Sequence, residues 1–217
     1  EQGCEWIASG EGVLARSLRT HQGALPERHE FLFKPYRIDN GQAGITCFFR
    51  DDRLSDLIGF EYAKWHGEDA AAHFVGALEE IAGRAAAGAP PVVSVILDGE
   101  NAWEYYPYNG YYFLDALYAA LEDHAQVATR TFAQVLDAAK NSSFEPLPGL
   151  VAGSWVYGDL ATWIGGADKN RAWDLLCAAK RSFDDVVASG RLSEAQIARA
   201  SRQLADCEAS DWCWWFG

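Results

Sequence analysis

Two carboxylates and an amide follow directly after a largely apolar, β-branched run. Residues 92–97 make up the run, and Asp98, Glu100 and Asn101 come just after it. Such a run predicts a strand buried on both faces, and the active sites of α/β proteins lie at the carboxyl ends of such strands. The acids are therefore candidates for acid/base work, because burial against aromatic rings raises a carboxyl pKa and keeps a proton available. The alternative is a strand followed by an acidic, helix-capping turn.

A second candidate acid, Glu11, lies between Gly10 and Gly12, just past an expected short strand at residues 5–9. Taken alone, it could be an acid in the first turn of a helix that complements the helix dipole. Taken with Asp98, it gives two carboxylates at the ends of two strands of one α/β domain. Two such carboxylates are the catalytic groups that a glycosidase needs.

Aromatic side chains gather near these acids. The chain has nine Trp, nine Tyr and eleven Phe, with clusters at residues 103–108 and 212–216. Rings beside carboxylates and amides suit a sugar, whose C–H faces stack on rings while its hydroxyls bind polar groups. A third stretch carries Trp155, Asp159 and Trp163 among glycines. It could be a sugar-stacking wall or ordinary packing between a helix and a loop.

Composition narrows the classes of partner. The net charge of −13 over 217 residues argues against nucleic acid and an anionic membrane surface, whereas a neutral ligand is compatible with it. No apolar run is long enough to span a bilayer. The five Cys and five His are scattered and lack metal-ligand spacing. We therefore expect no metal or cofactor, and reduced, buried thiols in a cytoplasmic protein.

Hydrophobic periodicity and turn residues predict the elements that position the acids. Strands are expected at residues 5–9, 33–39, 44–49, 92–97 and 126–131, with a turn at Asn40 and Gly41. Helices are expected at residues 51–64, 68–87, 113–121, 132–140, 171–189 and 193–207, and loops at 20–30 and 141–153. The pattern predicts an α/β fold, with residues 1–140 as a stretch of parallel barrel and residues 141–217 as a mostly helical segment.

These motifs together resemble glycoside hydrolase family 57, whose members are retaining enzymes that act on α-glucans. The family includes amylopullulanases, α-amylases, 4-α-glucanotransferases and branching enzymes. The Leu-Asp98-Gly-Glu-Asn-Ala-Trp-Glu stretch resembles the fourth conserved region, whose first acid is the general acid/base. The stretch from Trp6 to Glu11-Gly-Val-Leu resembles the third region, whose Glu is the nucleophile, although Ser9-Gly10 stands where relatives carry Thr-Asp. Residues 155–163 are similar to a late, substrate-contacting region.

The resemblance implies a (β/α)7-type barrel in which Glu11 is the nucleophile and Asp98 the acid/base. Retention implies that their carboxyl groups lie about 5–5.5 Å apart. It also implies an α-glucan oligo- or polysaccharide as partner, bound by Trp6, Glu100, Asn101, Trp103, Tyr108, Trp155, Asp159 and Trp163.

The family's first two regions, which include a His-Gln-Pro, do not occur, and the chain contains no Met. We therefore expect the later half of a catalytic module that lacks the N-terminal half of the barrel. Such a half-barrel would expose strand edges and self-associate. The rival function is a non-catalytic carbohydrate-binding or scaffold module that kept the aromatic wall. A polysaccharide deacetylase would need metal-binding His/Asp clusters, which the sequence does not show.

Overall fold

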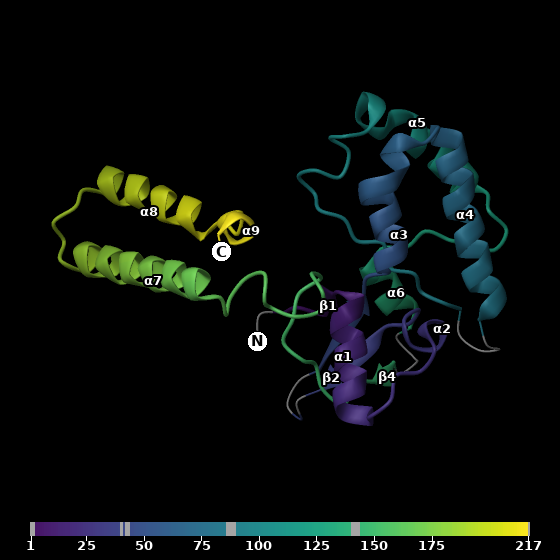
Figure 1. The fold of residues 1–217 in the computed structure, drawn as a ribbon, viewed down its shortest axis with the longest axis horizontal. Coiled ribbons are helices and arrows are strands. Elements are labelled where there is room, and N and C mark those ends of the chain that lie inside the picture. The colour runs from purple at the N-terminus through teal and green to yellow at the C-terminus, as the bar shows by residue number, and fades with distance from the viewer. Residues whose placement is uncertain (1–2, 40, 42–43, 86–89, 140–143, 217) are drawn as a thin grey trace. The chain divides into compact units, whose positions relative to one another are not determined.

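The structure, a computed structural model, describes residues 3–39, 41, 44–85, 90–139 and 144–216. It divides into two compact units, Glu1–Gly158 and Asp159–Gly217. The first unit contains all of the described strands and the second is built from helices and connecting turns (Figure 1).

The elements follow one another in a mixed α/β order. The strands are β1 (Trp6–Ser9), β2 (Tyr36–Asp39), β3 (Gly44–Phe49) and β4 (Glu145–Pro146). The α-helices are α1 (Glu11–Gln22), α2 (Arg28–Phe31), α3 (Asp52–Asp56), α4 (Gly67–Arg84), α5 (Tyr111–Glu122), α6 (Phe132–Ala138), α7 (Ala167–Ala188), α8 (Glu194–Glu208) and α9 (Trp212–Trp215). A π-helical turn η1 (Leu57–Glu61) and 3-10 turns η2 (Tyr62–Lys64) and η3 (Pro107–Gly110) complete them.

The strands form one mixed sheet in the order β1-β3-β2-β4. β1 runs parallel to β3, with Trp6 opposite Thr46. β2 runs antiparallel to β3, with Tyr36 opposite Cys47, and parallel to β4. The strands expected at residues 5–9 and 44–49 are confirmed, and the one expected at 33–39 begins only at Tyr36. The expected turn falls partly on Asn40, which lies outside the described residues.

The buried strand predicted at residues 92–97 is wrong. This segment makes a single parallel bridge, from Ser94 to Arg50, and its apolar side chains are only half-buried. Two local causes are visible. Pro90 and Pro91, just before it, have no N–H to donate to a ladder. β2 already pairs with β3 as far as Cys47, so only the last residues of that edge remain free.

Two further expectations are corrected. Residues 126–131 form no strand, because the His124 ring accepts hydrogen bonds from the backbone N–H groups of Gln126 and Val127. The loop expected at residues 20–30 is partly helical. α1 continues to Gln22 and ends on Gly23, whose φ of 78° suits glycine, and α2 follows.

The expected helices correspond to observed ones. Residues 51–64 are helical, although they pass from α3 into the π-helical and 3-10 turns. α4 and α5 pack side by side (Figure 1) and bury Phe74, Ile81 and Phe113. These side chains share one core with Leu14 of α1 and Tyr36 of the sheet. The core thus joins the sheet and its helices.

The second unit is a helical hairpin of α7 and α8, confirming the helices expected at residues 171–189 and 193–207. Ser193 caps α8 through the expected capping box with Gln196. Neither helix buries a residue fully.

The cysteines are free, as expected, but only two of them are buried. Cys47 and Cys213 are buried, whereas Cys4, Cys177 and Cys207 are exposed. The expectation of buried thiols is therefore wrong for the last three. Cys4 lies near the N-terminus, and Cys177 and Cys207 lie on α7 and α8, neither of which has a fully buried residue.

Candidate active site

Three parallel backbone segments end at one edge of the sheet, and each is followed by an acid. Glu11 follows β1, Asp51 and Asp52 follow β3, and Asp98 follows the bridging segment. The register is fixed by two hydrogen bonds: Arg50 N donates to Ser9 O at 2.9 Å, and Asp51 N donates to Ser94 O at 2.8 Å. This is the edge where α/β proteins build their sites.

The glycines that flank Glu11 are required by a loop that crosses them. A Cβ on Gly10 would lie 2.7 Å from the Cα of Trp155, and one on Gly12 would lie 2.9 Å from the Cα of Gly158. Real Cβ contacts are not this short, so a larger residue would push the loop away. The Gly-Glu-Gly motif therefore brings Trp155 against the start of α1.

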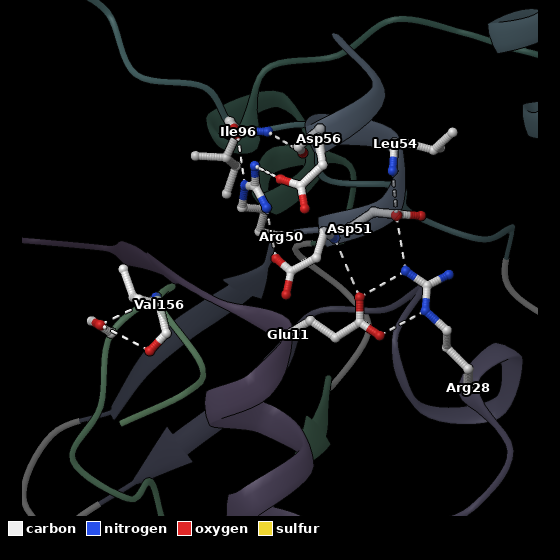
Figure 2. Close-up of polar contacts among 11 residues, drawn as sticks. Glu11, Arg28, Arg50, Asp51, Leu54, Asp56, Ile96 and Val156 are labelled. Atoms are coloured by element: carbon white, nitrogen blue, oxygen red, sulfur yellow. Dashed lines mark hydrogen bonds and ion pairs between the residues drawn. The ribbon is translucent and has the colours of Figure 1, made fainter. Parts of the chain in front are cut away.

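Glu11 is held by an arginine that the sequence did not indicate. Arg28 Nε donates to Oε1 at 2.6 Å and Arg28 Nη2 donates to Oε2 at 2.7 Å, a two-pronged ion pair (Figure 2). The backbone N–H of Asp52 also donates to Oε2, at 3.2 Å. The carboxylate of Glu11 is thus fixed in orientation by a guanidinium and by the start of α3.

The same guanidinium reaches Asp51, whose side chain is completely buried. Asp51 Oδ1 accepts hydrogen bonds from Arg28 Nη2 at 2.8 Å and from Leu54 N at 2.9 Å, so it also caps α3. Its other oxygen has no hydrogen-bond partner among the described residues. Burial opposes the charge of Arg28, but the bonds to Glu11 and Asp51 outweigh it and raise the pKa of Arg28.

A second arginine, Arg50, is buried and organises the neighbouring segment. Its guanidinium donates to Asp52 at 2.8 Å, to Asp56 at 2.7 Å and to the Ile96 carbonyl at 2.9 Å (Figure 2). It also lies 5.5 Å from the ring centroid of Trp155. Burial raises the pKa of Asp52, and the contact with Arg50 opposes that rise.

Asp98 is exposed and lines a cavity of about 400 Å³. Arg50, Asn101, Tyr105 and Trp155 line the same cavity. Its volume falls in the range of small-ligand sites, and its wall combines rings, an amide, a cation and a carboxylate. Such a wall can stack on a sugar face and bind sugar hydroxyls.

Glu11 lines a different cavity, of about 590 Å³, together with Arg28, Asp52 and Arg53. The structure therefore brings the two proposed catalytic acids to one sheet edge but does not bring them into one cavity. Their pairing as nucleophile and acid/base stays a prediction.

The remaining predicted site residues are divided between several environments. Trp6 on β1 packs edge-on against Phe132, with ring centroids 4.9 Å apart, and is 40% exposed. Trp103 is half-buried beside Tyr106, at 5.4 Å. Glu100 and Tyr108 are exposed, and neither lines the cavity of Asp98.

Asp159 and Trp163 belong to the second unit. Asp159 accepts a hydrogen bond from Ala161 N at 2.9 Å, and the Trp163 ring packs against Trp214 at 5.3 Å. The Trp173 indole donates to the Trp163 carbonyl at 2.8 Å. These contacts give both residues a role in the helical unit, and their role in sugar binding stays a prediction.

Sequence reasoning missed Arg28, Arg50, Asp51, Asp52 and Tyr105. A signal for three of them was present: Arg50-Asp51-Asp52 directly follows the strand at residues 44–49, in the same way that the chosen acids follow theirs. Arg28 carried no comparable signal, because it lies in a stretch expected to be loop.

The described ranges contain neither a candidate metal-binding cluster nor a membrane-spanning helix. No group of three His, Cys, Asp or Glu side chains there could hold a metal ion. No helix of the described chain is long and apolar enough to cross a membrane.

Comparison with known proteins gives a family match. The sequence model of glycosyl hydrolase family 57 matches residues 1–148. A search of curated proteins found no match. Among solved structures, a family 57 branching enzyme from Thermococcus kodakaraensis, determined in complex with glucose, is 15% identical with a TM-score of 0.71. A 4-alpha-glucanotransferase from Thermococcus litoralis is 18% identical with a TM-score of 0.52.

The two solved structures are much longer than the stretch they share with this chain. The branching enzyme match covers 98% of this chain and 47% of that one, and the glucanotransferase match covers 83% and 25%. At these identities the likeness shows the fold. It confirms the predicted class, a partial (β/α)7-type barrel followed by a helical segment.

Proposed function

The chain belongs to glycosyl hydrolase family 57, and on that premise we propose that it acts on α-glucans as a retaining hydrolase or transglycosylase. The observation that carries the proposal is the cavity of about 400 Å³ in which Asp98 lies beside Asn101, Tyr105 and Trp155. The two similar structures are a branching enzyme and a 4-alpha-glucanotransferase, which favours transfer to a sugar as much as transfer to water.

In the proposed mechanism Asp98 is the acid/base and Glu11 is the nucleophile. Asp98 donates its proton to the glycosidic oxygen while Glu11 attacks the anomeric carbon, so the leaving sugar departs and a glycosyl ester forms on Glu11. Asp98 then takes a proton from water or from a sugar hydroxyl, whose oxygen displaces Glu11. Two inversions give retention of the anomeric configuration.

In this mechanism the carboxyl groups of Glu11 and Asp98 must lie close together. A retaining pair works at about 5–5.5 Å, and Glu11 is paired with Arg28 in a neighbouring cavity. Attack therefore requires the Glu11 carboxylate to turn toward the cavity of Asp98 when glucan is bound. Gly10 and Gly12 on either side leave no side chain of their own in its way.

The aromatic and amide groups supply the binding. Trp155 and Tyr105 would stack on glucose rings, and Asn101 would bind hydroxyls in the same cavity. Residues 1–140 would supply barrel strands and helices, and residues 141–217 would continue the module. Free cysteines, three of them exposed, favour a reducing compartment such as the cytoplasm.

The test is to replace Asp98 by Asn and to measure both turnover of soluble amylose and binding of maltoheptaose. We expect kcat to fall about 10²–10⁴-fold, the usual value of a general acid/base, with binding little changed. Asp115→Asn is the matched control, because Asp115 is an exposed acid on α5 that does not line the cavity.

A rival function, a non-catalytic carbohydrate-binding module, is favoured by the separation of the two acids into different cavities. The same experiment decides between the two. If neither the unsubstituted protein nor Asp98→Asn turns over amylose while both bind maltoheptaose, the chain is a binding module.

A further inference from the structure

The segment that carries Asp98 is held by side chains where a strand would be held by a backbone ladder. Its one bridge is at Ser94, four residues before Asp98. Closer to Asp98, both backbone groups of Ile96 are bound by side chains. Ser55 Oγ accepts from the Ile96 N–H at 3.2 Å, and Arg50 Nε donates to the Ile96 carbonyl at 2.9 Å.

Arg50 is the side chain that ties this segment to the rest of the sheet edge. It is 8% exposed, and its other nitrogens bind Asp52 and Asp56 at 2.8 and 2.7 Å. A guanidinium spreads its donors over three nitrogens in one rigid plane, whereas the three N–H groups of a lysine share one nitrogen, so a lysine would lose part of this set. The cation also lies against the Trp155 ring in the wall of the cavity that Asp98 lines.

The same residue is connected to Glu11. Arg50 holds the side chain of Asp52, and the backbone N–H of Asp52 donates to Glu11 Oε2 at 3.2 Å. Arg50 is therefore bonded, directly or through one residue, to the segments that carry both acids of the proposed mechanism.

We propose that Arg50 is a positioning residue that fixes Asp98, through the Ile96 carbonyl, where it can protonate the departing glycosidic oxygen. The proposal rests on the function proposed above. The step it supports transfers one proton from the Asp98 carboxyl to the oxygen of the breaking C–O bond, and the bonding electrons stay on that oxygen. Without the Arg50 guanidinium, the segment keeps its backbone bridge between Ser94 and position 50 but loses the side-chain hydrogen bond to the Ile96 carbonyl, which is the bond nearest to Asp98.

The leaving group separates this role from a general structural one. A sugar alkoxide leaves only when it is protonated, whereas fluoride leaves with little help from an acid. A misplaced Asp98 therefore slows formation of the glycosyl ester from maltoheptaose but spares its formation from α-maltosyl fluoride, and kcat/KM reports this step. Release of the ester still needs Asp98 as the base, so release slows with either substrate. A protein damaged as a whole loses both activities.

The experiment compares Arg50→Lys with the unsubstituted protein on these two substrates. We expect kcat/KM on maltoheptaose to fall about 10–100-fold, as for a displacement of about 1 Å, while kcat/KM on the fluoride changes less than about threefold. kcat and KM for the fluoride should fall together, because slow release of the ester lowers both. Lys64→Met is the matched control, because Lys64 makes an exposed ion pair with Glu61 at the end of the helical run that begins with α3.

Ser55→Ala is a second variant, which still tests the proposal if Arg50→Lys does not fold. It removes only the acceptor of the Ile96 N–H, and it should show the same substrate dependence with a smaller loss. The thermal unfolding of both variants must remain cooperative. If kcat/KM then falls equally on both substrates, or falls on neither, the role of Arg50 is overturned.

Asp98→Asn, run alongside, keeps the two proposals apart. If Asp98→Asn loses kcat/KM on maltoheptaose and keeps kcat/KM on the fluoride, while Arg50→Lys leaves both unchanged or lowers both equally, the proposed function stands and the positioning role fails. If Asp98→Asn cleaves maltoheptaose normally, the proposed function fails, and the positioning role fails with it.

Discussion

Arg28 shows how single side chains shape this sheet edge. It binds two carboxylates, Glu11 and Asp51, and only Asp51 is fully buried. The Glu11 contact sets the orientation of the proposed nucleophile. The Asp51 contact compensates a buried charge whose second oxygen has no partner among the described residues. Arg28 thus has one role in the site and another in stability.

Replacing Arg28 by Met should destabilise the protein by about 3–5 kcal/mol, because it leaves the Asp51 carboxylate buried and unpaired. Adding Asp51→Asn should recover part of that loss, since an amide costs less to bury than a charge. Urea unfolding of the two single variants and the double variant measures the coupling. Strictly additive losses would contradict the pairing.

The cysteines give a second prediction at this scale. Burial raises the pKa of the Cys47 thiol to about 12 and also raises the pKa of Cys213. At pH 8 a thiol-disulfide reagent should therefore react quickly with Cys4, Cys177 and Cys207 and slowly with the two buried residues. The same protein in urea should react at all of them quickly. Equal native rates at every thiol would show the burial to be wrong.

At the scale of elements, the start of α3 is the junction between the two cavities. Asp51 caps it, and Asp52, its first residue, binds Glu11 through its N–H and Arg50 through its carboxylate. Burial is the main reason that the pKa of Asp52 is raised, and Arg50 limits the rise. This helix end therefore carries a carboxyl that is costly to ionise in the folded state.

That cost predicts a pH dependence. A carboxyl with a raised pKa holds its proton more tightly in the folded than in the unfolded protein, so the free energy of unfolding falls as the pH rises from about 4 through the raised pKa. Asp52→Asn lacks this fall, and its stability relative to the unsubstituted protein should grow across the same interval. Urea titrations at a series of pH values measure it. A stability difference between the two proteins that stays constant across the interval would contradict this account of Asp52.

The elements also show what a sequence can predict. The helices at residues 68–87, 171–189 and 193–207 were predicted because their apolar spacing and caps are local. The strand at 92–97 was wrong because pairing depends on which edge of β3 is free, and β2 occupies most of it.

The site divides in the same way. Glu11 and Asp98 could be proposed because each follows a segment expected to be a strand. Their contacts with Arg28 and Arg50 could not be predicted, because they join groups that lie 17 and 46 residues apart in sequence.

At the scale of the whole molecule, much aromatic surface is exposed. Trp214, Trp215 and Phe216 are 47%, 87% and 46% exposed. In the first unit β1, one of the two outer strands of the sheet, exposes Trp6. Exposed apolar surface of this kind on either unit favours association.

We therefore expect the 217-residue chain to self-associate as its concentration rises. Trp215→Glu should weaken the association, because it places a charge where an exposed ring would be buried. Glu208→Gln, an exposed change on α8, is the control. Sedimentation velocity over a concentration series measures the effect. A monomer at every concentration would show that these rings are not an association surface.

The most direct test of the account is to trap the covalent intermediate. A 5-fluoro-α-glucosyl fluoride reacts through its good leaving group, and its ring fluorine slows release of the ester from the nucleophile. Peptide mass spectrometry then locates the sugar. The account predicts a glucosyl adduct on Glu11, enriched in Asp98→Asn protein because no base is present to release it. An adduct on another carboxylate, such as Asp52, or no adduct at all, would contradict the assignment of Glu11 as the nucleophile.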